Sequence, residues 1–173
     1  VSTAGVQSNA SHTIYGRPDI SGDGRYIVFA SPANTLVPDD TNDYADIFLR
    51  DQFAGTTSRI SVGFDDSESN GSLQNPTISP DGRFIAFDSN ASNLVPNDTN
   101  GGYDIFLFDR HSGEMVRTSL EDNGVQPNGN SHNAYISANG RYTAFTHGYG
   151  SIGSFWYAYV YDRITEELTR ISN

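Results

Sequence analysis

The amino-acid sequence predicts an all-β protein built from three copies of a four-stranded unit. The turn glycines Gly24, Gly82 and Gly140 recur at intervals of 58 residues, and self-similarity at such a fixed period is the signature of a repeat architecture. Each glycine precedes a short apolar run that is rich in Ile, Val, Phe and Tyr, the residues that favour strands. The period and these short runs together predict a single array of repeats, 1–61, 62–119 and 120–173.

Each repeat divides into four expected strands. Repeat 1 contributes 17–21, 25–31, 46–51 and 56–61, repeat 2 contributes 74–79, 83–89, 104–109 and 114–119, and repeat 3 contributes 133–137, 141–147, 156–162 and 168–172. An Asp-Gly or Asn-Gly dipeptide joins the first two strands of each repeat and favours a tight hairpin. Asp51, Asp109 and Asp162 are separated by 58 and then 53 residues, so repeat 3 has lost five residues between its second and third strands.

The expected strands are apolar on consecutive positions, as in FIAF at 84–87 and DIFLF at 104–108. Such strands must be buried on both faces of their sheet. Small four-stranded sheets that are buried on both faces by copies of themselves are the blades of a β-propeller. A two-sheet sandwich would leave one face wet and show a cleaner alternation, so the pattern favours a propeller with three four-stranded blades per chain.

The repeated segments also resemble a known family. NPTISPDGRFIAF and RPDISGDGRYIVF, followed by DIFLFDR or DIFLRD and then RIS, are similar to the WD40-like repeats of TolB-type six-bladed propellers. The resemblance covers all three repeats and implies a propeller fold in a periplasmic or secreted protein. It leaves function open, because the same repeat occurs in binding modules, in Pal-binding TolB and in propellers attached to peptidases. Repeat 3 departs most from this pattern. It has Ala138 in place of Pro, Asn139 in place of Asp, and Tyr135 where the other repeats carry Asp19 or Thr77.

Three blades are too few for a closed ring, because propellers contain roughly four to eight. The sequence begins with VS and ends with RISN, so its ends fall at repeat boundaries. Two chains placed head to tail about a two-fold axis give six blades, whereas three chains give nine. We therefore expect a homodimeric six-bladed ring, and an excised half of a longer propeller is the alternative.

Composition excludes several partners. The net charge is −11 and only ten residues are Lys or Arg, which argues against a nucleic-acid partner because binding phosphates requires clustered cations. The chain has no Cys and hence neither disulfides nor thiolate metal sites. No apolar run approaches the roughly 20 residues that cross a bilayer, so membrane insertion is not expected.

The loop between the second and third strands is a candidate calcium site in repeats 1 and 2. It carries oxygen-bearing side chains in the order D-x-N-x-x-x-D, and Ca²⁺ takes roughly six to eight oxygen ligands. The candidate ligands are Asp40, Asn42, Asp46, Asp98, Asn100 and Asp104. The alternative is that these side chains close turns by accepting hydrogen bonds from nearby backbone N–H groups.

Two histidines lie in loops that lead into the first strands of blades 1 and 3, near one expected mouth of the channel. Imidazoles at this place could bind a metal or act as acid–base groups. No carboxylate at ligand spacing accompanies either of them in the sequence, so solvated loop histidines are the alternative. The candidate ligand-binding residues at this mouth are His12, Asp19, Thr77, His132 and Tyr135.

Arg59, Arg117 and Arg170 recur on the expected fourth strands. We expect each to lie across the hairpin from the aspartate that ends the third strand. A cross-strand pair of opposite charges is worth roughly 0.2 to 1 kcal/mol, so these arginines are interpreted as setting the register of the hairpin.

Two hypotheses for function remain. The first is a non-catalytic binding or scaffold module that offers its channel mouth to a protein, peptide or glycan. The second is a metal-assisted polysaccharide lyase or glycoside hydrolase that uses His12, His132 and loop carboxylates. The sequence contains no linked nucleophile, base and orienting group, which favours the first hypothesis.

Overall fold

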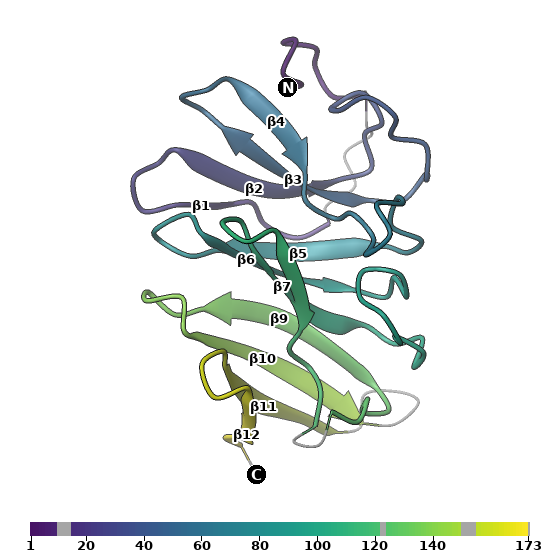
Figure 1. Cartoon of the computed structure of the whole chain (residues 1–173), viewed down its shortest axis with the longest axis vertical. Coiled ribbons are helices and arrows are strands. Elements are labelled where there is room, and N and C mark those ends of the chain that lie inside the picture. The colour runs from purple at the N-terminus through teal and green to yellow at the C-terminus, as the bar shows by residue number, and fades with distance from the viewer. Residues whose placement is uncertain (10–14, 122–123, 150–154, 173) are drawn as a thin grey trace.

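The computed structural model describes residues 1–9, 15–121, 124–149 and 155–172 of the chain. Within them, twelve strands form three four-stranded antiparallel sheets, and the structure assigns no helix. It follows that the described residues contain no helix that could span a membrane. Figure 1 shows the three sheets stacked face to face along the long axis, with the N-terminus at one end and the C-terminus at the other.

The strand boundaries follow the predicted repeats closely. Blade 1 contains β1 (Asp19–Ile20), β2 (Tyr26–Ser31), β3 (Asp46–Asp51) and β4 (Thr56–Arg59). Blade 2 contains β5 (Leu73–Ile78), β6 (Phe84–Ser89), β7 (Asp104–Asp109) and β8 (Glu114–Arg117). Blade 3 contains β9 (Asn130–Ile136), β10 (Tyr142–Tyr149), β11 (Phe155–Asp162) and β12 (Glu167–Arg170). In every sheet the four strands lie side by side in chain order, which confirms the expected hairpin succession.

The turn before the second strand is built the same way in all three blades. In blade 2, the hydroxyl of Ser79 donates to Asp81 and accepts from the backbone N–H of Phe84, while Asp81 also accepts from the N–H of Arg83. Gly82 closes this turn with φ of +72°, a left-handed conformation that glycine adopts without steric cost. The SPDG segment and its relatives therefore recur because each residue type fills a defined place in the turn.

The expected pairing of the fourth-strand arginines is wrong. Asp51 lies opposite Thr56, and Arg59 lies opposite Phe48, three residues further along the hairpin. Asp51 instead forms an ion pair with Arg25, whose Nη2 lies 2.7 Å from Asp51 Oδ2. The same pair recurs as Arg83 with Asp109 and Arg141 with Asp162. In all three blades this ion pair thus links the arginine after the turn to the end of the third strand. The arginine of the fourth strand has other partners.

The second strand is buried along its whole length only in the middle blade. All six residues of β6 are buried, with Ile85 and Phe87 in the core shared with blade 1 and Phe84 and Ala86 in the core shared with blade 3. Only Val28 is buried in β2, and β10 alternates between buried and more accessible positions over most of its length, because each strand has a neighbouring blade on one side. The prediction of two buried faces is confirmed for blade 2, and the outer blades each present one unpaired face.

One contact between adjacent blades is repeated along the stack. The ring of Tyr26 in blade 1 lies against the turn at Gly82 in blade 2, and the ring of Phe84 in blade 2 lies against the turn at Gly140 in blade 3. A Cβ added at Gly82 or at Gly140 would lie 2.6 Å or 2.5 Å from the ring of the preceding blade. An arginine of the next blade, Arg110 or Arg163, stacks on the same ring at 3.8 Å or 4.4 Å. The glycine, the aromatic ring and the arginine together set the distance between blades.

Candidate functional site

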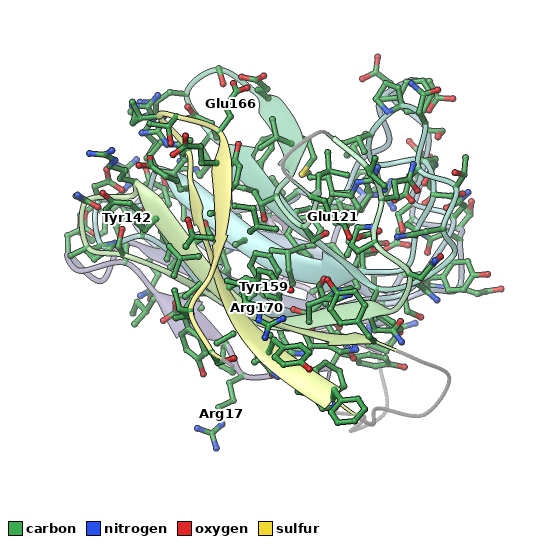
Figure 2. All side chains as sticks on the ribbon, turned by 90° about the horizontal axis from the view of Figure 1, so that it is seen from below. Arg17, Glu121, Tyr142, Tyr159, Glu166 and Arg170 are labelled. Carbon is green, nitrogen blue, oxygen red and sulfur yellow. The ribbon has the colours of Figure 1, made fainter. Side chains whose placement is uncertain are left out.

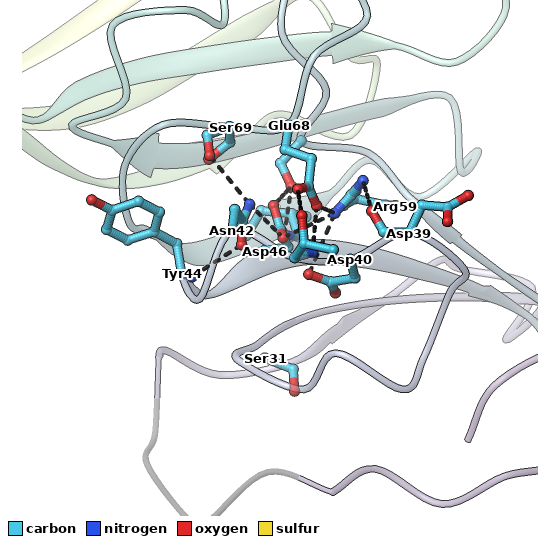
Figure 3. Close-up of polar contacts among 12 residues, drawn as sticks. Ser31, Asp39, Asp40, Asn42, Tyr44, Asp46, Arg59, Glu68 and Ser69 are labelled. Atoms are coloured by element: carbon cyan, nitrogen blue, oxygen red, sulfur yellow. Dashed lines mark hydrogen bonds and ion pairs between the residues drawn. The ribbon is translucent and has the colours of Figure 1, made fainter.

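Two groups of polar residues are candidates for function, and the first is the loop that the sequence singled out for calcium. In blade 1, Nη1 of Arg59 lies 3.4 Å from Asp40, 3.5 Å from Asp46 and 2.6 Å from Glu68 (Figure 3). The hydroxyl of Ser61 donates to Asp46 at 2.6 Å. Three carboxylates therefore converge on one guanidinium, which supplies the positive charge at this place.

Blade 2 repeats the arginine and two of the three carboxylates, with Gln126 at the position of Glu68. Nη1 of Arg117 lies 2.7 Å from Asp98 and 3.4 Å from Asp104, and all three side chains are at most 5% exposed. The hydroxyl of Ser119 donates to Asp104 at 2.6 Å, as Ser61 does to Asp46. Burial raises the pKa of Asp98, because removing a carboxylate from water disfavours its charged form.

The carboxyl groups of blade 1 are shifted in the same direction. Burial, together with the charge of Asp46, raises the pKa of Asp40 to about 6 despite the nearby Arg59. Burial also raises the pKa of Asp46, and the hydrogen bond from Ser61 opposes that shift. The cluster thus holds more negative charge than one guanidinium neutralises. Protonation of a carboxyl group reduces this excess of negative charge.

The asparagines of both loops close turns. Oδ1 of Asn42 accepts a hydrogen bond from the backbone N–H of Tyr44 at 3.0 Å, and Oδ1 of Asn100 accepts one from Gly102 at 3.1 Å. These are the Asx turns that the sequence offered as the alternative to calcium. Among the residues that the structure describes, no group of three or more His, Cys, Asp or Glu side chains has the geometry of a metal site.

Thermal melting distinguishes the Asx turns from the calcium alternative, whose candidate ligands are Asp40, Asn42, Asp46, Asp98, Asn100 and Asp104. Because Arg59 and Arg117 already lie among the carboxylates, we expect the melting temperature to be the same in millimolar Ca²⁺ and in EDTA. An ion that binds only the folded state at a hundredfold excess over Kd would contribute about 2.7 kcal/mol. A rise of several degrees in Ca²⁺ that disappears in the Asp40→Ala, Asp98→Ala double variant would establish calcium sites instead.

Blade 3 has a different arrangement at the corresponding place. Repeat 3 is five residues shorter between its second and third strands, and Tyr157 takes the position of Asp104, counting back from the aspartates that end β7 and β11. The guanidinium of Arg170 stacks on the ring of Tyr157 at 4.0 Å. A cation–π contact therefore replaces the buried ion pair, and Arg170 is itself exposed.

The residues expected at the channel mouth separate in the structure. His12 lies outside the described residues. Asp19 and Thr77 meet across the junction of blades 1 and 2, where Asp19 Oδ2 accepts from the Thr77 hydroxyl at 2.8 Å and from the N–H of Ile78 at 2.9 Å. Tyr135 is 71% exposed on blade 3. Asp19 and Thr77 hold two blades together, and His132 belongs to a second polar group.

His132 of β9 is joined to Asp88 of β6, a carboxylate 44 positions away in the sequence. Nδ1 of His132 lies 3.0 Å from Oδ2 of Asp88, and the same oxygen accepts from Nδ2 of Asn75 at 2.8 Å. Asp88 is fully buried, and its Oδ1 has no hydrogen-bond partner among the described residues. In the neutral form of the imidazole, a carboxylate at Nδ1 keeps the ring proton on that nitrogen and leaves Nε2 as an acceptor.

Two aromatic rings flank this histidine. The ring centroid of His132 lies 5.0 Å from that of Tyr103 and 5.7 Å from that of Trp156. Burial, together with the charge of Asp88, raises the pKa of Tyr103. The imidazole is therefore fixed from both sides as well as by the carboxylate.

A groove of about 490 Å³ opens beside this group. It is lined by Gln74, Asn75, His132, Asn133, Thr146 and Trp156. Asn75 and Asn133 occupy equivalent positions in β5 and β9, with φ of +51° and +60°, and both strands shift register there. Such bulges re-aim side chains, and asparagine tolerates the left-handed backbone better than most residues do.

Sequence reasoning identified His132 but not the groove around it. The missed residues are Asp88, Asn75, Gln74, Asn133 and Trp156. One signal was available, since the equivalents of Asp88 in the other repeats are Ala30 and Thr146. A carboxylate inside a strand that is expected to be wholly buried requires a partner, but the sequence does not name the histidine that supplies it.

The solved structures that this chain resembles are propellers. TolB from Acinetobacter baumannii is 19% identical with a TM-score of 0.57, and the match covers 92% of this chain and 32% of that one. The β-propeller domain of the Trilobed protease from Pyrococcus furiosus is 13% identical with a TM-score of 0.59, over 97% of this chain and 45% of that one. The chain has a TolB-like β-propeller fold.

A third similar structure, the putative TolB from Agrobacterium tumefaciens, is 16% identical with a TM-score of 0.57, over 92% of this chain and 50% of that one. This TolB-like chain thus spans between about a third and a half of the length of these three structures. No protein-family model and no curated protein matches the sequence. At these identities the similarity establishes the fold, and function has to be argued from the residues of the chain itself.

Proposed function

We propose that this TolB-like chain is a non-catalytic binding module that closes into a six-bladed ring as a head-to-tail homodimer. The observation that supports closure is the repeated blade contact, which is left half-made at both ends of the stack. Tyr142 takes the place of Tyr26 and Phe84 in blade 3, but it is 37% exposed, whereas Phe84 is 2% exposed. Figure 2 looks onto this face from the end of the stack, with Tyr142, Tyr159 and Arg170 on blade 3.

Blade 1 presents the complementary half of the same contact. A Cβ added at Gly24 would meet no atom within 4 Å, whereas at the equivalent Gly82 it would collide with the ring of Tyr26. Ile20 is 51% exposed, while the equivalent Ile78 is 5% exposed in the core. In a closed ring, Tyr142 of one chain would lie on Gly24 of its partner, and both apolar faces would be covered.

Molecular mass measured by light scattering tests this closure. At micromolar concentration we expect twice the 18.9 kDa of one chain. Gly24→Asn should return the mass to that of a monomer, because the new side chain would occupy the place of the partner's Tyr142. Asparagine tolerates the left-handed backbone at this position, where φ is +72°.

Gly113→Asn is the matched control. Gly113 lies in the turn between β7 and β8 with φ of +77°, and a Cβ there also meets no atom within 4 Å. It has no place in the repeated blade contact, so the variant should remain a dimer. A wild-type monomer, or equal masses for the two variants, would show that a second copy of this chain does not complete the ring.

The groove at His132 is the proposed ligand site, and it lies within one chain at the junction of blades 2 and 3. The ligand classes that the sequence left open are a protein, a peptide and a glycan. Catalysis remains the competing hypothesis for this groove. Turnover of polyuronides or glycosides with divalent metals that is abolished by His132→Ala would replace the binding proposal with the lyase or hydrolase one.

A periplasmic or secreted location is proposed on the resemblance of the repeats to TolB, and a signal segment in the encoded precursor would support it.

A further inference from the structure

We propose that the groove between blades 2 and 3 binds a neutral oligosaccharide, with Trp156 as a stacking platform and the amides of Gln74 and Asn133 as hydrogen-bonding groups. This inference rests on the proposed binding function and names the ligand class of the same site. The volume of the groove, about 490 Å³, lies within the range of roughly 300 to 1,000 Å³ that is usual for small-molecule sites.

The indole of Trp156 is positioned before any ligand arrives. Trp156 pairs with Gly148 across β10 and β11, and a Cβ at Gly148 would lie 3.0 Å from two indole carbons. The missing side chain thus lets the ring lie close to the neighbouring strand, while His132 lies at 5.7 Å between the ring centroids. Trp156 nevertheless remains 47% exposed. A held and half-exposed aromatic ring offers an apolar surface at little cost in conformational entropy.

The amides beside it have unused hydrogen-bonding capacity. Among the described residues, the side chains of Gln74 and Asn133 make no hydrogen bond, although both line the groove. An amide side chain donates through nitrogen and accepts through oxygen, and a sugar hydroxyl likewise donates and accepts. The amides and the indole therefore match the two kinds of surface that a pyranose ring presents, its hydroxyl rim and its C–H face.

The charges at the groove favour a neutral ligand. None of the six lining residues is Asp, Glu, Lys or Arg, although the chain carries a net charge of −11. Asp88 lies behind His132, fully buried, with one oxygen engaged by His132 and Asn75. An anionic polysaccharide would meet no Lys or Arg among these six residues and would be repelled by the net charge of the protein.

A peptide fits this place less well than a sugar does. Peptides commonly bind by adding a strand to a sheet edge, which requires a regular row of free backbone groups. β5 and β9 are the edge strands here, and both shift register where they form the groove. Bulges of this kind interrupt backbone pairing, so recognition must pass through side chains.

Trp156 is the one tryptophan of the chain, so its intrinsic fluorescence reports on the groove directly. We propose titrations with cellohexaose, maltohexaose, mannohexaose and chitohexaose as neutral probes. Oligogalacturonate serves as the anionic probe and an uncharged, unstructured dodecapeptide as the peptide probe. At least one neutral hexasaccharide should change the emission saturably, and the two other classes should not.

The variant Gln74→Ala, Asn133→Ala keeps the fluorophore and should weaken that binding about tenfold or more, because two hydrogen bonds are lost. Gln7→Ala is the matched control, an exposed amide outside the groove, and should bind as the wild type does. A saturable response to the peptide or to oligogalacturonate alone would overturn the neutral-sugar inference and leave the binding module standing. No response to any of the three probe classes would count against the sugar and against the proposed binding function together.

Discussion

Replacing Arg117 with methionine is expected to lower the free energy of unfolding by about 3 to 5 kcal/mol, the range found when one partner of a buried ion pair is removed. The guanidinium, Asp98 and Asp104 are all at most 5% exposed, and Nη1 lies within 3.4 Å of both carboxylates. Methionine keeps much of the volume, so the loss comes from two carboxylates that remain buried without a counter-charge. For a chain of this length the melting temperature should fall by roughly 10 °C.

The repeat provides the control for this variant. Arg170 holds the equivalent position in blade 3, where it is exposed and stacks on Tyr157 at 4.0 Å. Arg170→Met should cost no more than about 1 kcal/mol. Adding Asp98→Asn and Asp104→Asn to Arg117→Met should restore at least half of the loss, because the buried groups are then neutral. Equal losses for Arg117→Met and Arg170→Met in chemical denaturation would contradict the assignment of a buried, charge-dependent cluster in blade 2.

Stability is expected to rise as the pH falls from 7 to about 5, against the usual trend for an acidic protein. The pKa of Asp40 is raised to about 6 from its usual value of 3.8. The folded state therefore binds this proton more tightly than the unfolded state does. The stabilising contribution is complete below the unfolded pKa and is lost as the pH rises through the folded pKa. Asp46 and Asp98 are shifted in the same direction by burial.

The aspartates that end the third strands have the opposite effect on stability at lower pH. Hydrogen bonds from Arg83 and Arg141 lower the pKa of Asp109 and of Asp162 to about 2, and Arg25 lowers that of Asp51 further. Their contribution is present above the unfolded pKa and is lost as the pH falls through the folded pKa. Unfolding free energy should therefore pass through a maximum near pH 5 and decline below about pH 4.

Asp40→Asn isolates the first of these effects. The variant should be more stable than the wild type at pH 7.5 by on the order of 1 to 2 kcal/mol, after allowance for solvent screening of the shift. It should also show a flatter pH profile between 5 and 7. Asp39→Asn is the control, because Asp39 is the exposed neighbour, and its φ of +56° suits asparagine. If both variants follow the wild-type profile in urea unfolding, Asp40 does not carry the raised pKa.

The period of 58 residues and the consecutive apolar positions of each repeat were sufficient to predict the strands, their order and the propeller fold. These are local properties, since a turn such as SPDG and a run such as FIAF specify a hairpin wherever they occur. The loss of five residues from blade 3 could likewise be predicted from the sequence. The sequence also offered the Asx turns at Asn42 and Asn100 as one of two interpretations, because such turns form within a few residues.

Contacts between blades depended on the tertiary structure. The register of each outer hairpin places Arg59 three residues away from the expected aspartate and brings it among Asp40, Asp46 and Glu68. The approach of β6 to β9 brings Asp88 to His132, and the bulges at Asn75 and Asn133 open the groove beside them. Side chains separated by 44 residues meet there because two sheets pack face to face. The distance between the two sheets depends on glycines and aromatic rings of neighbouring blades. Sequence determines which side chains each strand carries, whereas the packing of one sheet on the next determines which of them form a site.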